Sequence, residues 1–131
     1  MRNGSGDRER TTDLGVVKIS NDAIAAIAHT AAMEIKGVTR MGGGISRTIC
    51  DMLTKRSPSR GIRIKIKDGE MRISVSVVID YGVDIPKIAD EVQENVKRAV
   101  EKMAGLVLSE VDVVVEGVSS PVVDKNARRP I

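Results

Sequence analysis

Residues 60–82, RGIRIKIKDGEMRISVSVVIDYG, alternate apolar and polar side chains on both sides of an Asp68-Gly69 dipeptide. Alternation with a period of two is typical of strands that bury one face. An Asp-Gly pair favours a tight turn between antiparallel strands, because glycine tolerates the positive φ that such turns require. The segment therefore predicts a β-hairpin whose apolar face needs a cover.

Helices expected on either side of this hairpin can supply the cover. Apolar residues recur at helical spacing over residues 21–35 and again over residues 86–104. Ser20 is the expected N-cap of the first helix, and Gly105 is the expected stop of the second. Further strands are expected over residues 15–19 and 106–117, and a short helix over residues 45–53. We therefore expect an α+β two-layer sandwich, ordered β-α-(short α)-β-β-α-β, with two main helices on one face of a sheet of about four strands.

The chain of 131 residues is expected to form one domain over residues 14–119. Residues 1–13 are polar and charged with little to bury, so we expect them to be disordered, and residues 120–131 are interpreted as a loose tail. The sequence has no Phe, no Trp and one Tyr, so its core must consist of small aliphatic side chains. A core this thin leads to the hypothesis that a second subunit completes it.

Charge is distributed unevenly along the chain. The formal net charge is +3, yet nine basic and only three acidic residues lie within residues 40–72. Such a patch can attract nucleic acid or an anionic membrane surface, although we favour the simpler interpretation of a solvated strand face. The alternative function is therefore a nucleic-acid-binding module that contacts phosphates. Its candidate anion-binding residues are Arg47, Lys55, Arg56, Arg60, Arg63 and Lys65.

No catalytic or metal-binding pattern stands out, so we expect neither enzyme activity nor a cofactor. His29 is the only histidine and Cys50 the only cysteine, which excludes zinc sites of the usual Cys/His type. Asp80 and Asp84 flank a turn, where capping explains them better than a cation site. The polar N-terminus does not resemble a signal peptide, and no stretch approaches the roughly 20 apolar residues of a membrane span. We therefore expect a cytoplasmic protein.

Two runs in the second half of the chain resemble a known family. They are YGVDIPKIADEVQENVK over residues 81–97 and LVLSEVDVVVEGV over residues 106–118. Together with residues 15–20 and 31–38, they resemble the alkaline-shock protein family of bacterial envelope stress-response proteins. The resemblance covers roughly residues 14–119. It implies a small cytoplasmic protein without known enzymatic activity, and it supplies no catalytic motif. Some members self-associate and are held at the membrane by a separate anchor protein, whereas others look like regulators encoded beside fatty-acid genes.

We therefore expect a non-enzymatic scaffold or regulatory protein of envelope stress response or homeostasis. It would act by self-association into a homo-oligomer and by docking of partners, among them a membrane-anchor protein. The candidate surfaces are the open face of the sheet and the polar side of the second helix. On the sheet the candidate contact residues are Val78, Val114, Ser74 and Ser76, with the two valines at the centre of the contact.

Overall fold

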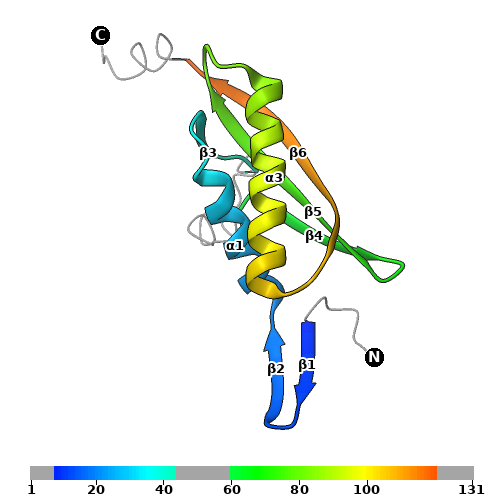
Figure 1. Ribbon diagram of the computed structural model, residues 1–131. Coiled ribbons are helices and arrows are strands. Elements are labelled where there is room, and N and C mark those ends of the chain that lie inside the picture. Colours follow the sequence, from blue (N-terminus) through cyan, green and yellow to red (C-terminus); the bar gives the residue numbers. More distant parts are fainter. Residues whose placement is uncertain (1–7, 44–59, 121–131) are drawn as a thin grey trace, which may run out of the picture.

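The computed structural model describes residues 8–43 and 60–120 of the chain (Figure 1). The hairpin predicted from the sequence is confirmed: β4 (Ile62–Lys67) runs antiparallel to β5 (Glu70–Asp80). Asp68 and Gly69 join the two strands with φ values of +54° and +79°. A two-residue turn of this kind needs positive φ at both positions, which explains the Asp-Gly pair.

Both predicted main helices are present, with the caps expected from the sequence. The hydroxyl of Ser20 accepts a first-turn backbone N–H of α1 (Asn21–Met33) at 3.2 Å. The carboxylate of Asp84 accepts a first-turn N–H of α3 (Ile85–Ala104), also at 3.2 Å. Gly105 ends α3 in the left-handed conformation with φ of +69°, as glycine often does at helix C-termini.

The main sheet is organised around β5. Along one edge of β5 runs β6 (Leu108–Ser119), which is parallel to it and is reached through the crossover helix α3. Along the other edge lie β4 and the short strand β3 (Val38–Met41), both antiparallel to β5. The two helices pack on the same face of this four-stranded sheet (Figure 1). The predicted α+β two-layer fold is therefore confirmed.

β3 and β4 lie end to end beside β5 and act as one interrupted strand. Between their ends, the Gly42 N–H donates to the Ser76 carbonyl, and the Ser76 N–H donates to the Gly61 carbonyl, both at 2.8 Å. The ladder of hydrogen bonds along this edge of β5 is therefore continuous, although residues 44–59 separate the two segments in the sequence.

The N-terminal part of the chain differs from the sequence-based expectation. Residues 8–12, expected to be disordered, form β1 (Arg8–Thr12), which pairs with β2 (Gly15–Ile19) in a separate two-stranded sheet. This hairpin extends away from the helices and the main sheet (Figure 1). The hairpin is held by backbone pairing between its strands and by a hydrogen bond in the turn, which the Leu14 N–H donates to the Thr12 hydroxyl at 3.1 Å. The strand predicted over residues 15–19 is confirmed as β2, whereas hydrophobic patterning missed β1 because this hairpin buries little apolar surface.

The strands of the main sheet also differ in membership from the expectation. Residues 15–19 were expected to be the fourth strand of the main sheet, but the fourth strand is β3. The second half of β3 falls in the segment that was expected to be irregular from Arg40 onward. The predicted short helix at residues 45–53 lies outside the described residues, as do residues 1–7 and the tail from residue 121.

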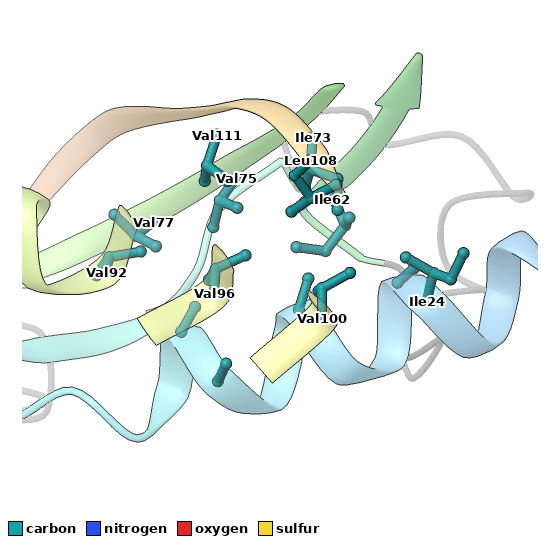
Figure 2. Close-up of a cluster of buried hydrophobic side chains, with 14 of the residues drawn as sticks. Ile24, Ile62, Ile73, Val75, Val77, Val92, Val96, Val100, Leu108 and Val111 are labelled. Carbon is teal, nitrogen blue, oxygen red and sulfur yellow. The ribbon is translucent and has the colours of Figure 1, made fainter. Parts of the chain in front are cut away.

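The core between the helices and the sheet is built from aliphatic side chains (Figure 2). The α3 helix contributes Ile88, Val92, Val96 and Val100, and β5 contributes residues of alternating position such as Ile73 and Val75. The α1 helix contributes Ile24 and four alanines, and their small side chains allow the helix backbone to approach closely. The innermost side chains are buried within a single chain, and completion of the core by a second subunit stays a prediction.

Candidate interaction surface

The face of the main sheet that points away from the helices carries side chains in rows across the strands. Arg63 of β4 lies opposite Ser74 of β5, which in turn lies opposite Asp112 of β6. Residues paired across neighbouring strands point to the same side of a sheet. Two further rows share this side, and we call the whole surface the open face. They are Lys65 with Arg72 and Glu110, and Ser76 with Val114.

The open face is polarised, with positive charge along β4 and negative charge along β6. Arg63 and Lys65 are exposed on β4, whereas Glu110 and Asp112 are exposed on β6. Arg72 of β5 lies between the basic residues of β4 and the acidic residues of β6, with its Nη1 atom 3.7 Å from Glu110 Oε1. Across residues 8–43 and 60–120, no ion pair engages Arg63, Lys65 or Asp112. These three charges are therefore available to a binding partner.

A shallow hollow of about 290 Å³ lies on the open face, between Arg63 and Glu116 and above Ser74, Ser76 and Val114. Glu116 Oε1 accepts the backbone N–H of Gly43 at 2.8 Å. The hollow is thus floored by short side chains and bordered by groups of opposite charge.

Glycines bring the junction between β3 and β4 close to β5 at one end of this hollow. Gly61 has φ of +79°, and a Cβ atom added there would lie 3.2 Å from the Gly42 and Ser76 carbonyl oxygens. A side chain at this position would therefore push the junction away from the sheet.

The predicted contact residues are placed differently from one another. Ser74 and Ser76 are half-buried on the open face, and Val114 is 45% exposed there. Val78 is only 7% exposed, which corrects the expectation that it is an accessible centre of the contact. Val77 and Ile79 beside it are buried as well, so the alternation of burial along β5 ends at this point. Sequence alternation alone could not reveal that change.

The candidate anion-binding residues are only partly brought together. Arg63 and Lys65 share the open face, and Arg60 is half-buried in the turn that leads into β4. Arg47, Lys55 and Arg56 lie outside the described residues. The acidic row on β6 runs parallel to the basic row about two strand spacings, or roughly 10 Å, away. A polyanion lying across this face would therefore meet carboxylates as well as cations.

Two amide side chains in the VQENV run of α3 have structural roles that the sequence alone did not reveal. Gln93 Nε2 donates to the Val111 carbonyl at 2.9 Å, which links the helix to β6. Asn95 Nδ2 donates to the Ala31 carbonyl at 2.8 Å, which links it to the last turn of α1. Carbonyls in the last turn of a helix lack intrahelical partners, so Asn95 satisfies one of them.

Lys97 and Glu101 fasten the C-terminal half of α3 to the start of β6. Glu101 Oε2 accepts from Lys97 Nζ at 2.8 Å and from the Leu108 N–H at 2.9 Å, and Lys97 also donates to the Leu108 carbonyl. The Lys97 ammonium holds the pKa of the Glu101 carboxyl below its usual value, and the Leu108 N–H acts in the same direction. These groups, together with Gln93, occupy the first part of the outer edge of β6 and shield it from pairing with another strand.

The remaining chemical candidates have structural surroundings. Asp84 caps α3, as expected, and Asp80 accepts a hydrogen bond from the Thr39 hydroxyl. His29 is half-buried on α1, and Cys50 lies outside the described residues. In the described part of the chain, no three His, Cys, Asp or Glu side chains are grouped as a metal ion would require.

None of the described helices combines the length and apolar character that crossing a bilayer requires.

Comparison with known proteins agrees with the resemblance seen in the sequence. Residues 9–120 match the model of the alkaline shock protein 23 family, described as having a cell envelope-related function. The uncharacterized protein YqhY of Bacillus subtilis is 33% identical over 107 residues, which cover 82% of this chain and 79% of YqhY. The uncharacterized protein YloU of the same organism is 31% identical over 112 residues, which cover 84% of this chain and 93% of YloU.

A further relative is the uncharacterized protein Spy1614 of Streptococcus pyogenes, 32% identical over 106 residues that cover 79% of this chain and 88% of the relative. No solved structure matches the chain. The family model spans most of the chain, including both helices and all four strands of the main sheet. The protein therefore belongs to the alkaline shock protein 23 family, whose function is related to the cell envelope.

Proposed function

We propose that this protein is a non-enzymatic scaffold or regulatory protein of the cell-envelope stress response, which acts by self-association and by docking of a partner. The open face carries the proposal. It presents Arg63, Lys65 and Asp112, which have no ion pair within residues 8–43 and 60–120, and a half-exposed valine, Val114. Neither α1 nor α3 covers it, since both pack on the opposite face of the sheet. Surfaces of this kind are common at contacts between proteins.

Each of the two proposed roles, self-association and partner docking, is assigned to a different surface. The open face serves self-association, and the outward side of α3 receives a second protein, such as a membrane anchor. This side of α3 bears exposed charges of both signs, including Lys87, Asp90, Glu94 and Arg98. A partner recognised here would be selected by its charge pattern, while the open face remained available to other copies.

Sedimentation velocity of the full-length chain over a range of concentrations tests the self-association. We expect the wild-type protein to associate and a Val114→Lys variant to associate more weakly, because the substitution places a charge within the open face. Val107→Lys is the matched control, since Val107 is 78% exposed and lies outside that face, in the connection between α3 and β6. A wild-type chain that stays monomeric throughout, or equal association of both variants with the wild type, would contradict this proposal.

A further inference from the structure

The polarity of the open face points to a specific partner and a specific geometry. We propose that the open face binds the same face of a second copy around a two-fold axis parallel to the strands. This inference rests on the self-association proposed above and assigns its geometry. Its basis is the separation of charge across three strands: basic residues lie on β4, acidic residues lie on β6, and between them β5 carries Ser74 and Ser76, together with Arg72, which pairs with Glu110.

Only one orientation of the axis makes two such faces complementary. Rotation by half a turn about an axis along β5 exchanges the two edges, so β4 of one copy lies over β6 of the other. Rotation about an axis across the strands would instead place β4 over β4 and β6 over β6. The first arrangement pairs unlike charges and the second pairs like charges, which cost free energy at an interface.

The proposed axis sets Arg63 of each copy against Asp112 of the other, and Lys65 of each copy against Glu110 of the other. Within one chain Arg63 and Asp112 are kept apart by the intervening strand, and neither has an ion pair among the described residues. The same contact therefore forms twice across the interface. Because each copy uses the same surface, the assembly closes as a dimer and does not extend into a chain.

The centre of the open face suits close approach of two sheets. Ser74 and Ser76 lie on β5, along the proposed axis, and their short side chains leave room for the opposite copy. Facing sheets pack about 10 Å apart, a gap that long Arg and Lys side chains at the margins can span. The pair between Arg72 and Glu110, with atoms 3.7 Å apart, draws the central guanidinium toward β6.

Other modes of association fit the surface less well. Edge-to-edge pairing along β6 is hindered near Leu108 and Val111, where Lys97, Glu101 and Gln93 already occupy backbone groups. A nucleic acid bound along the basic residues of β4 would have the acidic residues of β6 about one Debye length away, close enough to repel its phosphates. A second copy, by contrast, satisfies both rows at once.

Charge exchange between Arg63 and Asp112 tests the geometry directly. We expect Arg63→Asp and Asp112→Arg each to raise the dimer dissociation constant about tenfold, because two pairs become like-charge contacts. An equimolar mixture of the two variants should dimerise again, since every Arg63–Asp112 contact then joins opposite charges. The double variant Arg63→Asp/Asp112→Arg should dimerise alone for the same reason. Lys36→Asp, an equal change of charge at an exposed residue of the turn that follows α1, is the control and should leave the dissociation constant unchanged.

Sedimentation velocity gives the dissociation constants, and circular dichroism confirms that each variant is folded. A wild-type protein that never associates overturns the proposed function and, with it, this inference. A wild-type dimer that both single variants leave intact overturns the inference alone and leaves self-association standing. Loss of the dimer in the single variants without recovery in the mixture or in the double variant also overturns the proposed axis.

Discussion

The junction between β3 and β4 shapes one end of the open face, and a glycine substitution there offers a well-controlled test of the structure. Gly61 and Gly69 share the same φ of +79°. Around Gly69, in the β4–β5 turn, an added Cβ would meet no heavy atom within 4 Å. At Gly61 it would meet Met41 Cβ and the carbonyl oxygens of Gly42 and Ser76, all at 3.2 Å. The two positions therefore share the same φ and differ in packing.

The size of the expected effect follows from this comparison. A residue with a Cβ atom in the left-handed region costs about 1 kcal/mol, and this cost applies to both Gly61→Ala and Gly69→Ala. Crowding at Gly61 adds roughly 1–3 kcal/mol, as overpacking of a well-packed site commonly does, because two of the three neighbours are backbone atoms. We expect Gly69→Ala to lower the free energy of unfolding by about 1 kcal/mol and Gly61→Ala to lower it by about 2–4 kcal/mol.

Urea denaturation followed by far-ultraviolet circular dichroism measures both values. The chain has no Trp and a single Tyr, so helix and sheet signals are more informative than fluorescence. The denaturant slope shows whether the substitution has changed the surface exposed on unfolding. Equal losses at the two positions would refute the close packing of the β3–β4 junction against β5.

Two further predictions concern α3. Asn95→Ala should lower the free energy of unfolding by about 1–2 kcal/mol, because the Ala31 carbonyl loses its hydrogen-bond donor. Glu94→Ala, at an exposed neighbouring position, is the control and should change the free energy of unfolding little. Equal effects of the two substitutions in urea denaturation would contradict the role of Asn95. Glu101→Gln should lower the melting temperature at pH 7. The folded-state pKa of Glu101 lies below its usual 4.5, so its ionised form stabilises the fold above that pH, and the stabilisation is lost as pH falls through the folded-state pKa. The difference in melting temperature between Glu101→Gln and the wild type should therefore shrink as pH falls through the folded-state pKa of Glu101. A difference that stays the same size as the solution is acidified would show that the charge of Glu101 is not its source.

Much of the local structure follows from patterns that short segments carry by themselves. Alternation around Asp68-Gly69 predicted the β4–β5 hairpin, and helical spacing with Ser20 and Gly105 predicted both helices. These signals are readable because each depends on residues close together in the chain. The strand over residues 15–19 was also predicted and is β2, but β1 and its pairing with β2 escaped the same reasoning, because this hairpin is held by backbone pairing and buries little apolar surface.

The candidate site was predictable only in part. Ser74, Ser76 and Val114 were placed correctly on the side of the sheet away from the helices, since alternation alone assigns them to one face. The burial of Val78 departs from that alternation and depends on its tertiary surroundings. Gln93 and Asn95 stood out in the sequence only as part of a family-like run, and their bonds to β6 and α1 join residues 18 and 64 positions apart.

The sequence by itself determined the hairpin, the two capped helices, the aliphatic core and the class of fold, because each is written in local periodicity and composition. Only the tertiary structure decided that β3 continues the line of β4 along one edge of β5, that β6 runs parallel to β5 along the other edge, and that the basic residues of β4 and the acidic residues of β6 share one face of the sheet. Strand order and register arise from contacts between distant segments, whose free energies depend on how both helices pack on the sheet. The polarity of the open face is a consequence of that register, since β4 and β6 come together only through β5.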